Sequence, residues 1–394
     1  MVRNNIPFDL EVSILSNLPL KSLKRFACVC KAWGLVFENP NFLSIFSNNF
    51  ISHQHSYYDD TPLLLLQMIT DLDTGGLDTR YNSLYSLCGE SFINKIKLEW
   101  PNPFYEEDLF YYILEYCSID GTLCLCNHRD SLFRIVLWNP TTKKLNVIPR
   151  SPNEFVPCEW SFIKIQGFGY DYIRDDYKII RELYLVPPRN DSHDDEDIYR
   201  KRMWEIYSLR SNSWRTLHID MPFSYSGSAY FPPGERIYIY KTCHWLGSSD
   251  TNPNGPCLVS FNLSDEIFIT TLIPFFKDAK LPDNYFSIHL VLLNGSIATV
   301  SWYHGSPTFH ISVLGKLGVT ESWIKLFIIG PLLGVDHPIG VGKEGNIFFR
   351  KQDGELILFD LRTQMIRELA INGWHFSQVV TYKESFIPIG GINL

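Results

Sequence analysis

Two pairs of cysteines are the first candidates for chemistry in this sequence. Cys28 and Cys30 lie in "LPLKSLKRFACVCKAW" (18–33), and Cys124 and Cys126 lie further along the chain. A zinc site requires C-x2-4-C spacing and a second pair of ligands, whereas both pairs here are C-x-C and neither has such a partner. If Cys28 and Cys30 lie on a helix, their thiols are about 200° apart around its axis. If Cys124 and Cys126 lie on a strand, they share one face of it. We predict that these cysteines pack as small apolar side chains, and no metal or other cofactor is expected.

Two glycine patterns and the histidines are the other candidates. "GVGKEG" (340–345) matches G-x-G-x-x-G, but a strand-like run follows it, so no helix N-terminus is available to hold a pyrophosphate. We interpret it as a turn from one blade-like repeat to the next. "GFGYD" (167–171) is too short for a phosphate loop, and its glycines are expected to permit close backbone packing. No H-E-x-x-H or G-x-S-x-G element occurs, and the histidines are dispersed, for example His218, His244, His304 and His310.

Length, composition and charge narrow the class of protein. The chain has 394 residues, of which 45% are hydrophobic, 20% charged and 15% aromatic, and the aromatic share favours strands. The net charge of −8 argues against a nucleic-acid partner, because phosphate contacts demand a basic face. Residues 1–46 hold five basic and three acidic side chains, so a mildly basic module precedes an acidic body. The acidic run 190–197 lacks the spacing and glycine of a calcium loop, and we interpret it as a solvated insertion.

The sequence also bears on localisation. Polar and acidic residues interrupt the first dozen positions, which is unlike a signal peptide. The apolar run 63–66 is far too short to cross a bilayer. The nine cysteines follow no framework spacing, as is typical of reduced thiols. We therefore expect a soluble intracellular protein, in the cytoplasm, the nucleus or both, with no membrane partner.

The first 46 residues have the periodicity of helices. Pro7 suits a first helical position, and apolar side chains recur behind it on one face, namely Leu10, Ile14, Leu15 and Leu18. The quoted stretch 18–33 predicts a second helix, whose apolar face consists of Leu20, Leu23, Phe26, Ala27, Cys30 and Trp33. Asn39 and Pro40 predict the start of a third helix, which runs to about Ser47. So small a module cannot bury all these groups by itself, so they pack against either the rest of the chain or a partner.

Beyond about residue 61 the period changes to that of strands, and one pattern recurs. A hydrophobic strand, a polar turn and a second strand occur five times, for example in "RIVLWNPTTKKLNVIP". Equivalent positions are 69, 54, 52 and 46 residues apart, at Trp138, Tyr207, Phe261, Val313 and Phe359. Periods near 50 residues are typical of kelch-type β-propeller blades. With a divergent copy at 61–87 we predict about six blades, and a pair of β-sandwiches is the alternative.

Four segments resemble known domains. "IPFDLEVSILSNLPLKSLKRFACVCKAW" with the following "NPNF" resembles an F-box, over about residues 6–42. The body resembles the F-box-associated (interaction) domain of plant F-box proteins. Three hallmark segments of that domain occur in order, "CSIDGTLCL" (117–125), "LWNPTTKKLNVIP" (137–149) and "GFGYDYIRDDYKII" (167–180). The resemblance therefore covers nearly the whole chain.

The resemblance implies a fold and a division into domains. A small all-α F-box of three helices would precede an all-β, kelch-like propeller of about six blades, which makes the chain an α+β multidomain protein. The expected boundaries are 1–46 for the F-box, 47–60 for a connector and 61–394 for the propeller. These boundaries follow the change from helical to strand-like periodicity.

The resemblance also implies a function. The amino-terminal helices would dock on a Skp-type adaptor, which links to a cullin and a RING subunit, and the propeller would select the protein to be ubiquitinated. The chain would then be a non-catalytic receptor subunit. Lys21, Lys24 and Lys31 rim the apolar face and suit an acidic partner. Carried over onto this sequence, the adaptor-binding residues are Pro7, Leu10, Ile14, Leu15, Leu18, Pro19, Leu23, Phe26, Val29, Cys30 and Trp33.

The sequence departs from the F-box pattern at three positions, and other functions stay open. Family members usually have an aliphatic residue in place of Glu11, Glu in place of Ser13, and often Arg in place of Asn17. One alternative is an adaptor-bound scaffold or regulatory protein without a degraded client. Another is a propeller enzyme with a catalytic group assembled from distant loops. The sequence assigns no client-binding residues, although the aromatic segments 223–231 and Tyr170–Tyr172 are candidates.

Overall fold

The computed structural model describes much of the strand-rich body and part of the amino-terminal region. The residues described are 7–18, 26, 33, 36, 42, 45, 63–73, 78–88, 92, 94–101, 111–114, 118–127, 133–156, 160–186, 201–218, 236–247, 256–274, 286–342, 345–373, 377–385 and 389. None of the helical segments among them has the length and hydropathy that a membrane crossing requires. The acidic run 190–197, the aromatic segment 223–231 and Cys28 with Cys30 lie outside these residues.

Helix α1 spans Phe8–Leu15. Pro7 occupies the position just before it, one residue earlier than predicted, and its carbonyl accepts two hydrogen bonds from amides of the first turn. At the other end Ser16 Oγ and Asn17 Nδ2 donate to the carbonyl of Ser13, at 3.1 and 2.7 Å. Short polar side chains compete with the backbone in this way, and the helix stops at their position.

Parts of the second and third predicted helices are also described. Phe26 and Trp33 of the second and Phe42 and Ile45 of the third have helical conformation, and so does Val36, which lies between the two predicted segments. These five positions agree with an all-α amino-terminal module. The remaining residues of the two predicted helices lie outside the described part of the chain.

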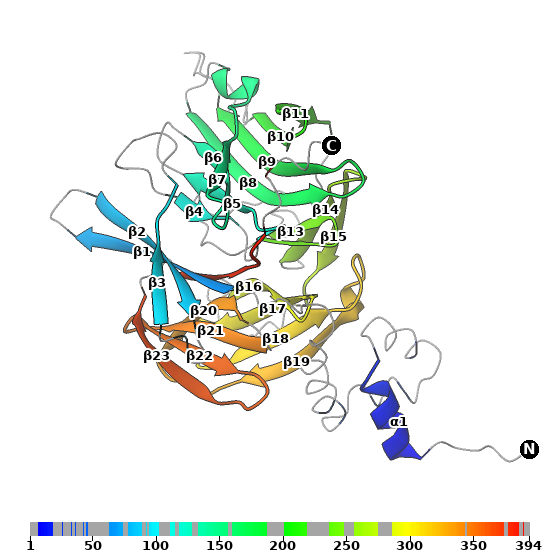
Figure 1. Ribbon diagram of the computed structural model, residues 1–394. Coiled ribbons are helices and arrows are strands. Elements are labelled where there is room, and N and C mark those ends of the chain that lie inside the picture. Colours follow the sequence, from blue (N-terminus) through cyan, green and yellow to red (C-terminus); the bar gives the residue numbers. More distant parts are fainter. Residues whose placement is uncertain are drawn as a thin grey trace, which may run out of the picture. The chain divides into compact units, whose positions relative to one another are not determined.

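Twenty-four strands in the described part of the chain form six four-stranded antiparallel sheets (Figure 1). The chain divides into two compact units, 1–61 with 271–372 and 62–270 with 373–394. The second unit holds four sheets. The first of them consists of β24 (Gln378–Tyr382), β1 (Leu63–Asp73), β2 (Asp78–Cys88) and β3 (Asn94–Leu98). The next consists of β4 (Tyr111–Ile113), β5 (Leu123–Asn127), β6 (Arg134–Asn139) and β7 (Lys144–Val147).

The other sheets follow the same order along the chain. The third consists of β8 (Trp160–Asp171), β9 (Asp176–Val186), β10 (Lys201–Ser208) and β11 (Ser213–Leu217). The fourth consists of β12 (Arg236–Ile239), β13 (Thr242–Gly247), β14 (Cys257–Asn262) and β15 (Ile267–Leu272). The first unit holds the fifth, with β16 (Phe286–Leu293), β17 (Ser296–Tyr303), β18 (Phe309–Leu314) and β19 (Trp323–Ile329). It also holds the sixth, with β20 (Val335–Val341), β21 (Asn346–Lys351), β22 (Glu355–Asp360) and β23 (Ile366–Asn372).

The two ends of the strand-rich region meet in the first sheet. Strand β24 pairs with β1, and Leu65 lies opposite Val380. A closing strand taken from the carboxy-terminal end leaves no blade incomplete and removes a free edge. The described chain is therefore a helical amino-terminal region followed by a six-bladed β-propeller, as predicted, and the β-sandwich alternative is wrong.

Two details of the predicted repeat differ from the structure. The five recurring strand pairs are the third and fourth strands of their sheets, with Trp138 in β6 and Phe359 in β22. The divergent copy at 61–87 is instead the hairpin β1–β2, the second and third strands of its sheet. "GVGKEG" begins in β20 and leads into β21 of the same sheet, so it does not connect one blade to the next. The repeating structural unit is a sheet of four strands, whereas the recurring sequence pattern covers only two of those strands.

Burial explains which strands were easy to recognise. Every residue of β5 is buried, and Cys124 and Cys126 are 1% and 0% exposed, in agreement with their predicted packing. The fourth strands β7 and β11 are largely exposed and carry alternating polar side chains, as edge strands commonly do. Side chains of the first two sheets share one hydrophobic cluster, which includes Leu65, Leu125 and Trp138.

Candidate functional site

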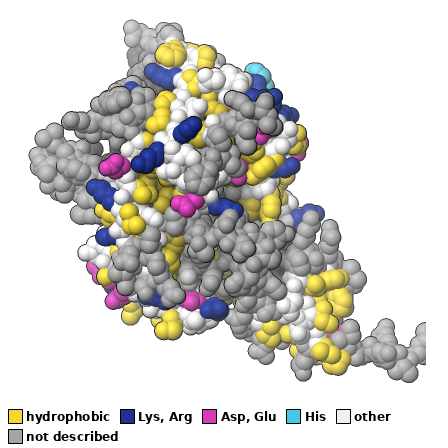
Figure 2. All heavy atoms as spheres, viewed as in Figure 1, with side chains coloured by type: hydrophobic (Ala, Val, Ile, Leu, Met, Phe, Trp, Pro, Cys, Tyr) yellow, Lys and Arg dark blue, Asp and Glu magenta, His cyan; other side chains and the backbone are white. Residues whose placement is uncertain are grey.

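Helix α1 exposes a group of large apolar side chains. Phe8, Leu10 and Ile14 are 54%, 55% and 55% exposed, and hydrophobic side chains gather over the helix (Figure 2). Val12 and Leu15, on the other side of the same helix, are 8% and 4% exposed. One side of α1 is thus fixed to the protein, and the other offers apolar surface. Large exposed apolar groups of this kind are typical of protein-binding surfaces.

The remaining predicted adaptor-binding residues divide into two groups. Leu18, Phe26 and Trp33 are partly buried and pack against the hydrophobic cluster of their unit. The rings of Phe26 and Trp33 meet edge to face, with centroids 5.3 Å apart. Buried side chains of this cluster come from the amino-terminal region and from the fifth and sixth sheets. The rest of the predicted set, Pro19, Leu23, Val29 and Cys30, lies outside the described residues.

The structure adds one residue to this surface and places the atypical positions. Sequence reasoning missed Phe8, which is as exposed as Leu10; its position directly after Pro7 on an apolar helix was the available signal. Ser13 is exposed and Glu11 is partly buried. Because Val12 is buried next to Glu11, the helix keeps an aliphatic contact with the protein beside the position where the F-box pattern is broken.

A second candidate surface is built on the turn between β8 and β9. Asp171, at the end of β8, is fully buried and accepts hydrogen bonds from Lys178 Nζ at 2.8 Å, Arg174 Nη1 at 2.9 Å and Ser264 Oγ at 2.5 Å. Arg174 and Lys178 also donate to backbone carbonyls of the β14–β15 turn, at 2.7 and 2.9 Å. We call Asp171, Arg174, Lys178 and Ser264 the anchor network. It fixes the β8–β9 turn against the next sheet.

The charge of Asp171 is matched by this network. Burial by itself raises the pKa of the Asp171 carboxyl, but the hydrogen bonds from Lys178, Ser264 and Arg174 outweigh burial and hold that pKa well below its usual range. A buried carboxylate that is fully hydrogen-bonded and paired is stable as an anion. Asp171 is therefore ionised across the physiological pH range.

The glycines of "GFGYD" permit the close packing that the sequence predicted. A Cβ on Gly169 would lie 2.4 Å from Tyr238 Cε2 and from Leu263 Cδ1. A Cβ on Gly167 would lie 2.5 Å from Cys243 Cβ. Such approaches are too short for carbon atoms, so β8 lies against the fourth sheet only because these positions lack side chains.

Four tyrosines meet above the anchor network, and we call Tyr170, Tyr172, Tyr177 and Tyr238 the tyrosine cluster. The ring of Tyr170 lies edge-on to those of Tyr172 and Tyr177, with centroids 4.8 Å apart in each case. The hydroxyl of Tyr238 donates to the Tyr170 carbonyl at 2.5 Å. Tyr177 and Tyr238 are 2% and 8% exposed, whereas Tyr172 is 55% exposed. Two rings of the cluster, Tyr177 and Tyr238, are therefore buried, and Tyr172 is accessible to solvent.

The turn that precedes β5 lies against this cluster. The hydroxyl of Tyr177 donates to the Ile119 carbonyl at 3.3 Å and accepts from Thr122 Oγ1 at 3.4 Å. Asp120 lies between these two contacts and has a φ of +48°. Burial raises the pKa of the Asp120 carboxyl, and the more distant charge of Lys383 opposes this shift.

A third polar group in the second unit is structural. Arg181 is 1% exposed and pairs with Glu154 at 2.7 Å and Glu205 at 2.6 Å. Its guanidinium lies 3.8 Å from the ring centroid of Trp214, and Ser151 Oγ donates to Glu205 at 2.5 Å. Every charge here is matched by a partner, so the group ties the segment before β8 to its sheet and presents no open chemistry.

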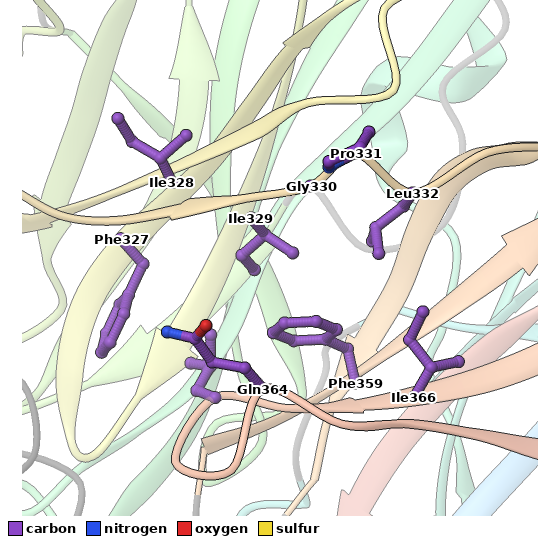
Figure 3. A pocket seen from close by; sticks show the side chains of 10 residues that line it. Phe327, Ile328, Ile329, Gly330, Pro331, Leu332, Phe359, Gln364 and Ile366 are labelled. Carbon is purple, nitrogen blue, oxygen red and sulfur yellow. The ribbon is translucent and has the colours of Figure 1, made fainter.

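The first unit contains a small apolar pocket of about 200 Å³ between β19 and the β22–β23 turn. Phe327, Ile329 and Phe359 point into it (Figure 3), and Gln364 is the polar side chain in its lining. Small-molecule sites usually have about 300–1,000 Å³. The pocket is therefore of a size for one apolar side chain.

The comparisons with known proteins agree with this division of the chain. The family model described as "F-box domain" matches residues 4–45, and the model described as "F-box associated beta propeller domain" matches residues 82–386. The second match spans well over half of the chain. The chain therefore belongs to the family of proteins with an F-box associated beta propeller domain. It is a plant-type F-box protein, as the resemblance indicated.

Several relatives from Arabidopsis thaliana resemble the chain over most of its length. The F-box/kelch-repeat protein At3g23880 is 26% identical, with 94% of this chain and 89% of that protein covered. The F-box protein At3g07870 is 25% identical, with 90% and 82% covered. An F-box followed by a propeller indicates a substrate-adaptor role in Skp–cullin–F-box complexes, and the F-box implies binding of a Skp-type adaptor. Proteins of this architecture are generally non-catalytic receptors.

Proposed function

We propose that this protein is the substrate-recognition subunit of a Skp–cullin–F-box ubiquitin ligase. Its F-box docks on a Skp-type adaptor and through it on the cullin and RING subunits, and its propeller binds the protein to be ubiquitinated. The order of the two matched domains, 4–45 and then 82–386, carries the proposal. The domain limits that we propose remain 1–46, 47–60 and 61–394.

The exposed side of α1 supports a docking role for this helix. Leu10 and Ile14 offer apolar surface, and Pro7 starts the helix. Leu15 is buried, so its proposed contribution is to hold α1 in position. Leu18, Phe26 and Trp33 are partly buried and combine internal packing with residual surface. Affinity in such interfaces comes mainly from a few apolar anchors, and rim charges mostly orient the partner.

Proximity labelling in cells tests whether the protein has a client that is degraded. The full chain, fused to a proximity label, is expressed with and without a proteasome inhibitor, and labelled proteins are quantified in both conditions. A receptor is expected to have at least one labelled partner that accumulates when the proteasome is inhibited. Labelled partners whose amounts do not change would favour the alternative of an adaptor-bound scaffold without a degraded client.

A further inference from the structure

The tyrosine cluster and Asp120 bring aromatic rings and a carboxylate together. Burial raises the pKa of the Tyr170, Tyr177 and Tyr238 hydroxyls, and the Asp120 carboxylate lies near enough to raise each of them further. The rings come from β8, β9 and β12 and the turn after β8, and Asp120 comes from the turn before β5. Tyr170 contacts Tyr172, Tyr177 and Tyr238, and Tyr177 bonds on both sides of Asp120. These residues, distant in the sequence, therefore share one small volume within a single unit of the chain.

This group is held rigidly before any partner arrives. The anchor network fixes the β8–β9 turn, and Tyr170 donates its hydroxyl to the Asp175 carboxylate within that turn. Gly169 allows the Tyr238 ring to lie against β8. Binding surfaces that are already ordered lose less entropy when they bind. Aromatic side chains on strands and on a turn that is fixed in this way are suited to that purpose.

The negative charge of Asp120 is not balanced by a direct contact within the described part of the chain. Asp120 is partly buried, and no hydrogen bond or ion pair to its carboxylate is found among the residues that the structure describes. The charged groups facing it are Lys383, which acts on it at a distance, and Asp175, which lies in the neighbouring turn. Arg174 is directed to Asp171 and to a backbone carbonyl. A carboxylate in this state favours a cation beside it.

We propose that the tyrosine cluster binds a basic side chain, lysine or arginine, of the client protein, with the carboxylate of Asp120 as its counter-ion. The faces of Tyr170 and Tyr172 receive the aliphatic stem and the cationic head, because aromatic faces attract cations. An acidic client side chain meets the charges of Asp120 and Asp175 and is rejected. This inference rests on the proposed function, since it names the chemistry of the client that the propeller selects.

The test uses small probes and the full chain. Ligand-observed saturation-transfer NMR measures the binding of N-acetyl-lysine amide and N-acetyl-arginine amide, with N-acetyl-norleucine amide as the neutral analogue. The cationic probes are expected to bind at least about tenfold more tightly than norleucine, because a hydrogen bond to a charged group is stronger than a neutral contact. Comparison of the two cationic probes distinguishes lysine from arginine as the preferred residue.

Two variants and a matched control sharpen the test. Asp120→Asn keeps a residue that tolerates a positive φ, and Tyr172→Ala removes an exposed ring. Asp120→Asn is expected to weaken cation binding about tenfold, and Tyr172→Ala several-fold. Asp353→Asn, on an exposed turn of the other unit, changes the net charge equally and leaves cation binding unchanged.

Failure of this inference is separate from failure of the proposed function. Norleucine binding as tight as that of lysine and arginine, or an Asp120→Asn variant with wild-type cation binding, would overturn the inference. Adaptor co-purification is measured on the same variants. It is expected to be unaffected, because Asp120 and Tyr172 belong to the second unit and α1 belongs to the first.

Discussion

The α1 surface and the tyrosine cluster represent two ways to make a binding region. On α1, exposed apolar side chains stand on a short helix whose other side is buried. In the tyrosine cluster, the exposed ring of Tyr172 lies on a turn that buried charges hold in place, beside rings from neighbouring strands. The first region is continuous in sequence, whereas the second draws its rings from two sheets and the carboxylate of Asp120 from the turn before β5. The comparison predicts that apolar anchors determine affinity in the first region and that order and charge determine it in the second.

The largest expected effect concerns the network under the tyrosine cluster. Asp171→Ala leaves Lys178 buried beside an empty position and removes the partner of Arg174. Breaking a buried ion pair in this way costs about 3–5 kcal/mol. Chemical denaturation of the full chain measures the loss, and Asp353→Asn is the exposed control. A loss below about 1 kcal/mol would contradict the anchor role.

Substitutions on the exposed side of α1 are expected to lower the affinity for the adaptor and to leave the free energy of unfolding unchanged. Leu10→Ala with Ile14→Ala removes exposed apolar groups, and we expect adaptor affinity to fall by at least about 2 kcal/mol. Met365→Ala, which is equally exposed on the β22–β23 turn, is the control. Calorimetric titration with a Skp-type adaptor measures both. Unchanged affinity in the double variant would remove α1 from the docking surface.

The same measurement applied to Leu18→Ala and Trp33→Ala separates docking from internal packing. Both side chains are partly buried, and each variant is expected to lose at least about 2 kcal/mol of adaptor affinity. A change in the free energy of unfolding of the same size, without a change in affinity, would assign these residues to packing alone.

A smaller loss of stability is expected at Gly169, where the backbone of β8 lies close to side chains of the fourth sheet. Gly169→Ala places a methyl group against Tyr238 and Leu263, and overpacking of this kind costs about 1–3 kcal/mol. Gly305→Ala is a useful comparison, because no atom lies within 4 Å of its added Cβ although its φ is +81°. Denaturation midpoints compare the two variants. Because Gly169 has no positive φ, a loss in Gly169→Ala reports the close contact, whereas a loss in Gly305→Ala reports backbone strain. No loss in Gly169→Ala would contradict a cost from the contact.

Stability is also expected to depend on pH. Burial lowers the pKa of His244 to about 3, and burial with the nearby His337 lowers that of His289 to about 3. Both rings are neutral in the folded protein and protonate on unfolding below their ordinary pKa, so stability is complete above about pH 6.5 and falls as the pH falls. The expected loss is about 1.4 kcal/mol per pH unit for each histidine.

Denaturation at pH 7, 6 and 5 measures this loss while Asp171, whose pKa is held low, stays ionised. His244→Gln removes one titrating ring and is expected to reduce the slope by one histidine's share. A slope that is identical in the variant would contradict the assignment to His244.

Much of the fold was accessible from the sequence, for reasons that differ along the chain. In five of the six sheets the third and fourth strands are joined by a polar turn, and the third strand is largely buried, so this pair repeats visibly; Phe261 in β14 and Phe359 in β22 are examples. The first strands were harder to identify, and the placement of "GVGKEG" was wrong. Strand pairing depends on contacts with distant neighbours, and a glycine pattern does not show which strand follows.

The candidate sites differ in the same way. Helical spacing in one continuous stretch predicted an apolar face on α1. The structure exposes Leu10 and Ile14 of that face but buries Leu15, so the predicted face was wrong at Leu15, and Phe8 was missed. The tyrosine cluster was indicated only through Tyr170–Tyr172. Tyr238 and Asp120 join it through the pairing of sheets, and nothing in their local sequence marks that meeting.

The most direct test of the account is the complex itself. The full chain is co-expressed with a Skp-type adaptor, purified through a tag on the chain, and compared with Ile14→Asp and with the control Met365→Asp. The account predicts a stoichiometric complex for the wild type and the control and its loss in Ile14→Asp, because a charge on the apolar side of α1 is desolvated without a partner. A stable, folded chain that never retains the adaptor would contradict it.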